Sequence, residues 1–221
     1  LKQFADELEP SRDFQADLQK LIRRVFTEHQ RIIFNGNGYD DAWLEEAKKR
    51  GLYNLTSTAD ALPVYTAQKN MDLFINHGIY TKGEIEARAE IHIENYSTVL
   101  TIEAKTMADM IRHQILPAVS KYADDLCQRA YHKDAMGVSR QYETSTAKEI
   151  AALTDALQEI CAKMETDLDA IPADATAAMN YCHDVLIPDM AKAREAADQL
   201  ETLTASDYWP FPVYSDLLFY V

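Results

Sequence analysis

IAALTDALQEICAKMETDLDAI, residues 150–171, is the stretch that decides the fold of this chain. Apolar residues recur along it every seven positions, at Ile150, Leu157, Met164 and Ile171. Leu153 and Ile160 occupy the complementary positions of the same repeat. A heptad of this kind is typical of a helix that packs along its length against other helices. Thr146 and Glu149 match a capping box, so we expect the helix to begin there.

A second heptad follows Pro172, which should end the first helix. Asp174 is a suitable N-cap for the next helix. Its apolar positions are Met179, Leu186, Ala193 and Leu200, interleaved with Cys182, Ala196 and Leu203. Pro188 interrupts this pattern without preventing a helix. We therefore expect residues 174–203 to run back along the first helix.

The segment before these two helices supplies a third apolar face. Thr81 and Glu84 form a capping box, and helix-forming sequence continues to about Lys133 with only Pro117 to kink it. At ~1.5 Å per residue such a helix is close to ~80 Å long and needs packing partners. Its apolar face comprises Leu116, Val119, Tyr122, Ala123, Leu126 and Ala130. The sequence predicts a mainly α fold that ends in a long-helix antiparallel three-helix bundle.

Residues 1–80 predict shorter helices. The first four apolar residues, Leu1, Phe4, Ala5 and Leu8, keep helical spacing with no cap before them, so we expect the chain to begin inside a helix of a longer protein. Ser11 or Asp13 should cap a second helix whose apolar stripe is Phe14, Leu18, Leu21, Val25 and Phe26. Pro63 suits the first turn of a later helix that runs to His77 and stops at Gly78.

Between these helices, Asn35-Gly36-Asn37-Gly38 predicts a tight turn with positive φ angles. Asp40 or Asp41 should then begin a helix that ends at Gly51. The turn lacks the third glycine of a dinucleotide fingerprint. Read as an EF-hand loop, it would place Ile33 and Leu44 where calcium needs carboxylates. A plain turn is the interpretation that remains.

The end of the chain differs in kind from the helices before it. Its aromatic residues are Tyr208, Trp209, Phe211, Tyr214, Phe219 and Tyr220. So many apolar rings predict a tail that docks on the rest of the molecule. The expected domains are residues 1–80, the helical end of a larger domain; residues 81–204, the elongated bundle; and residues 205–221, the aromatic docking tail.

Composition narrows the classes of function. The formal net charge is -14 and the pI is near 4.8, which disfavours binding to nucleic acid or to an anionic membrane surface. Cys127, Cys161 and Cys182 are too far apart for a CxxC motif and lie in apolar stripes, so we expect reduced, buried thiols. Together with the absence of an 18-residue apolar run, this predicts a cytoplasmic protein.

The charged and histidine-containing patterns predict no chemistry. Asp109 and His113 share a helix face as a surface pair, and His92 falls beside Ile85 and Tyr96, where we expect a core histidine. The carboxylates Glu84, Glu86, Glu90 and Glu94 alternate with Arg88 as a solvated face. Lys48, Lys49 and Arg50 complement the dipole at a helix C-terminus. We therefore predict no catalytic, cofactor-binding or metal-binding residue in this chain.

Several motifs, in order along the chain, resemble the C-terminal region of type III glutamine synthetases. They are Arg31-Ile-Ile-Phe-Asn-Gly-Asn-Gly-Tyr39, Glu94-Asn-Tyr96, Ile115-Leu-Pro-Ala-Val-Ser-Lys-Tyr122, Tyr208-Trp-Pro-Phe-Pro-Val-Tyr214 and the end Asp216-Leu-Leu-Phe-Tyr-Val221. Ala61-Leu-Pro63 through His77-Gly-Ile-Tyr-Thr81 is similar to glutamine synthetases more generally. The resemblance covers the whole chain.

The resemblance implies a parent enzyme that ligates ammonia to glutamate with ATP and Mg²⁺ or Mn²⁺, as a ring-shaped homo-oligomer. The family's metal-binding, nucleotide-binding and glutamate-binding motifs are expected before Leu1, and no residue here matches them. Arg31 and Arg50 are assigned structural roles. The implied partners are the rest of the catalytic domain and other subunits, and the implied role of this chain is structure and assembly.

An independent helical interaction module is the alternative, with residues 146–171 and 174–203 recruiting a partner helix. The heptads last only three to four repeats and face a third apolar stripe, which favours packing within the chain. A small helical metalloenzyme is disfavoured because the spacing of metal ligands is missing.

Overall fold

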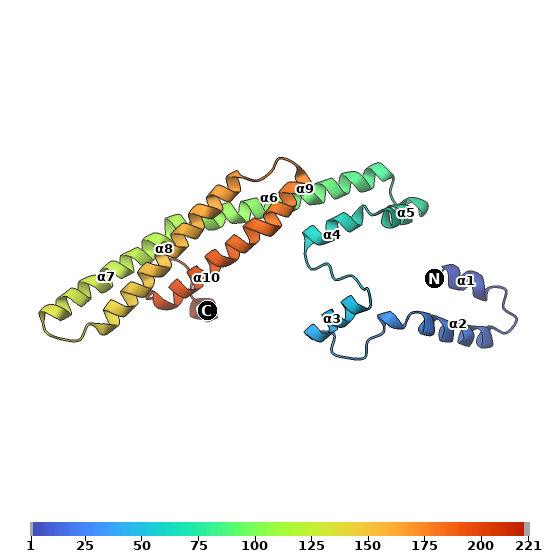
Figure 1. The fold of residues 1–221 in the computed structure, drawn as a ribbon, viewed down its shortest axis with the longest axis horizontal. Helices are drawn as coiled ribbons and strands as arrows, with labels where there is room; N and C mark the ends of the chain where they lie inside the picture. The colour runs from blue at the N-terminus through green and yellow to red at the C-terminus, as the bar shows by residue number, and fades with distance from the viewer. Residues whose placement is uncertain (1, 219–221) are drawn as a thin grey trace. The chain divides into compact units, whose positions relative to one another are not determined.

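The computed structural model describes residues 2–218, and within them the secondary structure is helical, without strands (Figure 1). The mainly α prediction is confirmed. Backbone proximity divides the chain into two compact units, which we call the N-terminal unit (Leu1–Thr56) and the long-helix unit (Ser57–Val221). The predicted domain boundaries after residues 80 and 204 rest on sequence motifs and stay predictions.

The helices of the N-terminal unit are α1 (Lys2–Leu8), α2 (Phe14–Glu28), the short 3₁₀ helix η1 (Gln30–Ile32) and α3 (Asp41–Lys49). The long-helix unit comprises α4 (Thr58–Tyr65), α5 (Gln68–Asn76), α6 (Lys82–Met110), the π-helical turn η2 (Ile111–Ile115), α7 (Leu116–Ala135), α8 (Gln141–Asp169), α9 (Ala175–Tyr181), a second π-helical turn η3 (Cys182–Leu186), α10 (Ile187–Leu203) and α11 (Tyr214–Leu218). None of the helices between residues 2 and 218 has the length and apolar character needed to cross a membrane.

Most of the predicted helix ends are confirmed. Asp13 caps α2, Asp40 caps α3 and Asp174 caps α9, each by accepting a hydrogen bond from a backbone N–H of the first turn. At the other ends, Gly51 and Gly78 have φ angles of 69° and 63°, the left-handed conformation that terminates a helix. The chemistry of single capping residues therefore predicts these boundaries correctly.

The prediction that Pro63 lies in the first turn of a helix running to His77 is wrong. The Ser57 hydroxyl caps a helix that starts earlier, accepting the Asp60 N–H at 3.0 Å, so Pro63 falls inside α4. The chain then breaks at Thr66 and Ala67 before α5 begins. The serine provides the stronger start signal, since Pro only tolerates the first turn whereas Ser satisfies an unpaired N–H.

The long helix begins with the predicted capping box. The Thr81 N–H donates to the Glu84 carboxylate at 2.8 Å, and the Glu84 N–H donates to the Thr81 hydroxyl at 3.3 Å. Helical backbone then continues from α6 through η2 into α7. This confirms one long helical segment from Lys82 to Ala135.

Pro117 and Pro188, the two prolines in the first turns of α7 and α10, each follow a π-helical turn. The Leu116 N–H bonds to the carbonyl of Ile111, five residues back, and Pro117 follows. The Ile187 N–H bonds in the same way to Cys182, ahead of Pro188. A proline has no N–H to donate and its ring crowds the preceding turn, and a widened turn gives that ring space. The interruptions predicted at both prolines thus take the form of π turns.

Helix α8 packs against both α7 and α10 and stands at the centre of the core (Figure 1). Its heptad residues Ile150, Leu157 and Met164 are completely buried. Helix α9, the turn η3 and helix α10 together bury Met179, Cys182, Leu186, Ala193 and Leu200 completely. The long helical segment contributes Leu100, Ala104, Ala108, Ile111, Ile115, Val119, Tyr122 and Leu126. The predicted apolar stripes therefore face one another within the unit.

The predicted start of α8 at a Thr146–Glu149 capping box is wrong, because the helix begins at Gln141 and Thr146 is buried inside it. Gly137, with φ 66°, turns the chain after α7. Lys133 then pairs with the buried Glu143 in the first turn of α8, across the turn that joins the two helices. This cross-turn ion pair fixes the earlier start, which local capping chemistry does not reveal.

The first part of the tail docks as predicted. Tyr208, Trp209 and Phe211 pack against the core, and the Tyr208 hydroxyl donates to the Asp125 carboxylate at 3.2 Å. The Tyr208 and Tyr122 rings lie 5.0 Å apart. The predictions for Tyr214, Phe219 and Tyr220 fall outside the side chains that the structure describes.

Because the α8 seam supports both neighbouring helices, Leu157→Ala should lower the free energy of unfolding by roughly 2–5 kcal/mol. Urea denaturation followed by circular dichroism at 222 nm measures the change. The exposed neighbour Gln158 serves as the control, and Gln158→Ala should change stability by less than about 0.5 kcal/mol. Equal effects of the two substitutions would contradict the assignment of the seam.

Candidate functional site

The Asn-Gly segment of the N-terminal unit forms an aromatic cluster around Arg50. The Phe34 and Trp43 rings stack with centroids 4.3 Å apart, and the Arg50 guanidinium lies 6.0 and 5.8 Å from their centroids. Arg50 also donates to the Ile33 carbonyl at 2.7 Å and to the Glu46 carboxylate at 2.6 Å. The guanidinium therefore ties the loop to helix α3, which agrees with the structural role expected for Arg50.

Gly36 is required by this cluster for a reason that sequence did not suggest. The predicted positive φ angles are absent at Gly36 and Gly38. Instead, a Cβ added at Gly36 would lie 2.4 Å from the Phe34 ring, whereas one at Gly38 would meet nothing within 4 Å. Close approach of an aromatic ring, rather than backbone conformation, explains the first glycine.

The predicted histidine and cysteine environments are partly confirmed. Asp109 and His113 form the expected exposed pair, 3.6 Å apart, and Cys161 and Cys182 are buried thiols. His92 is exposed beside Tyr65, so the expectation of a core histidine is wrong. Cys127 is exposed too and is not the buried thiol predicted. Helical spacing gives the face on which a residue lies but not whether a neighbouring helix covers that face.

Ion pairs link the helices of the long-helix unit. Lys163 bridges Asp167 and the buried Asp189, joining α8 to α10, and Arg112 pairs with Glu165, joining η2 to α8. The hydrogen bond from Lys163 holds the pKa of Asp167 below its usual value, and Arg112 does the same for the pKa of Glu165. Lys133 likewise lowers the pKa of Glu143. All three carboxylates favour the folded state when they are ionised.

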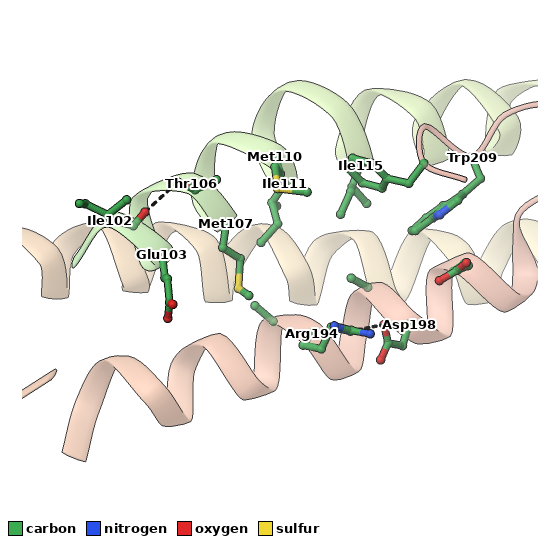
Figure 2. Close-up of a pocket in the computed structure, with 14 residues that line it drawn as sticks. Ile102, Glu103, Thr106, Met107, Met110, Ile111, Ile115, Arg194, Asp198 and Trp209 are labelled. Carbon is green, nitrogen blue, oxygen red and sulfur yellow. Dashed lines mark hydrogen bonds and ion pairs between the residues drawn. The ribbon is translucent and has the colours of Figure 1, made fainter. Parts of the chain in front are cut away.

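A cavity of about 450 Å³ lies between α6–η2 and α10, and we call it the interhelical cavity (Figure 2). Met107, Met110 and Ile111 project toward it from the long helical segment, and Trp209 closes one side from the tail (Figure 2). The facing wall of α10 is formed by the small residues Ala193 and Ala197 together with the Arg194–Asp198 ion pair.

Sequence reasoning missed the interhelical cavity, although it placed Ala193 and Ala196 in the apolar seam. The available signal was side-chain size, because alanines opposite one another or opposite flexible methionines leave space that larger residues would fill. Heptad spacing records which positions face inward but not whether their volumes fill the interior.

No group of three or more His, Cys, Asp or Glu residues within residues 2–218 is arranged to hold a metal ion. The carboxylates of the ion pairs between helices are already bound to lysine or arginine. Beside the Asn-Gly loop, the rings of Phe34 and Trp43 stack on each other. The arrangement supports a packed scaffold that includes an apolar cavity between α6–η2 and α10. The prediction that the chain carries no catalytic, cofactor-binding or metal-binding residue stays a prediction.

Comparison with known proteins places these features in a family. A family model described as the glutamine synthetase C-terminal domain matches residues 17–134. A glutamine synthetase of Butyrivibrio fibrisolvens is 34% identical over 212 residues, and a type-3 glutamine synthetase of Dictyostelium discoideum is 31% identical over 217 residues. These alignments cover 91% and 93% of this chain but only 29% of each relative.

Replacing Gly36 should disturb the aromatic cluster, because the added Cβ displaces the Phe34 ring from Trp43. We expect Gly36→Ala to shift the emission of Trp43 to longer wavelength and to lower the melting temperature of the N-terminal unit, with Trp209→Phe as the background. Gly38→Ala is the matched control and should leave both unchanged. Identical spectra for the two alanine variants would contradict the packing explanation.

Acid should destabilise the long-helix unit through the carboxylates of lowered pKa. The unfolded chain binds more protons than the folded chain between the two pKa values of each group, so the free energy of unfolding should fall as pH drops from about 5 to about 3. Urea titrations at fixed ionic strength measure the slope. Glu165→Gln should flatten it, whereas Glu159→Gln, at an exposed position of the same helix, should not. A slope unchanged by Glu165→Gln would exclude a contribution from its pair with Arg112.

Proposed function

Because the chain belongs to the glutamine synthetase C-terminal domain family, we propose that it is the C-terminal structural and assembly region of a glutamine synthetase. The parent enzyme would ligate ammonia to glutamate with ATP and Mg²⁺ or Mn²⁺. This segment alone would perform no catalysis. Its partners would be the rest of the catalytic domain and other subunits of a homo-oligomer, in the cytoplasm.

The extent of the match supports a structural role. The chain spans about 29% of the length of the relatives it matches, so about seven-tenths of a glutamine synthetase lies outside it. That larger part has room for the nucleotide, metal and glutamate sites that the resemblance implies. The residues in hand are occupied instead by helix caps, ion pairs and packing.

The observation that carries the proposal is the uncovered apolar surface of the N-terminal unit. Among its described residues, only Leu21 and Ala47 count as buried, although the unit contains three helices of the α type. Its exposed large apolar residues are Phe14, Ile22, Phe26, Ile32, Ile33, Tyr39, Leu44, Tyr53 and Leu55. Covering a Phe or Ile side chain contributes about 1.5–3 kcal/mol, so this unit gains stability chiefly by packing on another part of a longer protein.

The long-helix unit also supports the assignment, because its apolar positions are covered by helices of the same chain. Its heptad positions at Ile150, Leu157 and Leu200 are fully buried among helices of the same chain. An independent module that recruits a partner helix would instead present such a seam to solvent. The structure thus favours a self-contained buttress over the alternative of an interaction module.

The first test is catalytic. The purified chain, assayed for ATP-dependent glutamine formation with Mg²⁺ or Mn²⁺, should give no turnover above a protein-free control. A glutamine synthetase of the same family, such as that of Butyrivibrio fibrisolvens, provides the positive control. Appreciable turnover by the chain alone would overturn the proposal that catalysis resides elsewhere.

A second test addresses the uncovered apolar stripe of α2. In the longer enzyme, Phe26→Glu should prevent packing of α2 and reduce activity or assembly at least tenfold, because a buried carboxylate without a partner is costly. Activity and native mass, measured by light scattering, report the two effects. Arg23→Glu, at an exposed site on the same helix, is the matched control. Equal and small effects would show that the stripe stays in solvent.

A further inference from the structure

A second hollow, in the N-terminal unit, is walled largely by polar side chains. Its volume is about 610 Å³, and the residues around it include Phe26, Gln30, Arg31, Ile33, Asn35 and Arg50. We call it the Arg31 hollow. Two arginines and no carboxylate line it, although the chain has 36 acidic residues against 22 lysines and arginines. It is therefore an electropositive place on an acidic protein.

The two arginines of the hollow differ in how they are used. Arg50 is held by the chain itself, since its Nε donates to the Glu46 carboxylate at 2.6 Å and its Nη1 donates to a loop carbonyl at 2.7 Å. The Arg31 guanidinium makes no ion pair and no hydrogen bond with any described residue from 2 to 218. The side-chain amides of Gln30 and Asn35 also lack a partner among those residues. Three side chains with free donors therefore accompany one fixed guanidinium.

Apolar surface adjoins these donors. Phe26 and Ile33 line the same hollow and are 60% and 37% exposed. Phe26 also belongs to the apolar stripe of α2, which is proposed above to pack on another part of a longer protein. A small hydrated anion would pair with Arg31 but would leave both apolar side chains in water. A segment of protein can do both, by placing an apolar side chain on Phe26 and a carboxylate on the guanidinium.

We propose that the Arg31 hollow docks an acidic segment of the parent enzyme from outside this chain, one in which an aspartate or glutamate adjoins an apolar side chain. The carboxylate pairs with Arg31, and the amides of Gln30 and Asn35 supply further N–H donors. The net charge of -14 disfavours an acidic segment on the chain as a whole, so the hollow sets where it docks. This inference rests on the proposed function, because it names the kind of segment that the N-terminal unit meets in a glutamine synthetase.

Limited proteolysis of the longer enzyme tests the contact, because an undocked N-terminal unit is cleaved faster. Arg31→Glu replaces attraction by repulsion and should raise the rate of cleavage within residues 1–56 roughly tenfold or more. Arg31→Lys keeps the charge but loses the planar fork, so its rate should lie in between. Arg23→Glu makes the same charge change at an exposed site on α2 and should match the unsubstituted enzyme. Added salt should speed cleavage of the unsubstituted enzyme but not of Arg31→Glu.

The isolated chain lacks the partner segment and serves as a second control. Because the Arg31 side chain has no bond within the described residues, Arg31→Glu should change neither the cleavage rate nor the emission of Trp43 in the isolated chain, with Trp209→Phe as the background. The Trp43 ring centroid lies 5.8 Å from the Arg50 guanidinium, so its emission reports whether the wall of the hollow stays folded.

Three outcomes would overturn the inference. Equal cleavage rates for Arg31→Glu and Arg23→Glu in the longer enzyme would exclude the contact, and the proposed function would survive if Phe26→Glu still disrupts that enzyme. An equal effect of Arg31→Glu in the isolated chain would place the partner carboxylate within the chain. Saturable binding of inorganic phosphate to the isolated chain, abolished by Arg31→Glu, would assign the hollow to a small anion.

Discussion

Burial of the α8 seam is the interaction on which the long-helix unit depends. Ile150, Leu157 and Met164 are inaccessible to solvent because α7 covers one side of α8 and α10 covers the other. The long segment from Lys82 to Ala135 draws on the same contacts, since helical stability in proteins comes mainly from packing of an apolar face. Ion pairs from Lys163 to Asp189 and from Arg112 to Glu165 then fix the alignment of helices that apolar contacts alone would allow to slide. The arrangement of helices in the long-helix unit therefore depends on the buried apolar residues of α8.

The two units differ in how much of their apolar surface is covered by the chain itself, and this difference bears on the proposed role. The long-helix unit covers its own seams, whereas the N-terminal unit leaves Phe14 and Phe26 largely in solvent. A region with one covered and one uncovered part is suited to packing on a larger body through the uncovered part. Because the chain belongs to the glutamine synthetase C-terminal domain family, we propose that this larger body is the rest of a glutamine synthetase.

Much of the fold could be predicted from sequence because helices obey local rules. Heptads at Ile150 and Met179, caps at Asp40 and Thr81, and a terminating glycine at Gly51 act within a few residues, and each is confirmed. The failures have non-local causes. The start of α8 depends on Lys133 meeting Glu143 across a turn, and Gly36 is required by the position of the Phe34 ring. The interhelical cavity depends on residue volumes of helices far apart in sequence. Exposure of His92 and Cys127 depends on which flank of a helix its neighbours cover.

The central claim is that this chain serves as the structural C-terminal region of a glutamine synthetase. A segment exchange tests it most directly: the part of the Butyrivibrio fibrisolvens enzyme that aligns with this chain is deleted, or replaced by the chain itself, and glutamine formation and native mass are measured for each protein. If the chain is the structural C-terminal region, deletion should abolish assembly and activity, and the exchange should restore both substantially. An enzyme that assembles and turns over normally after the deletion would contradict it.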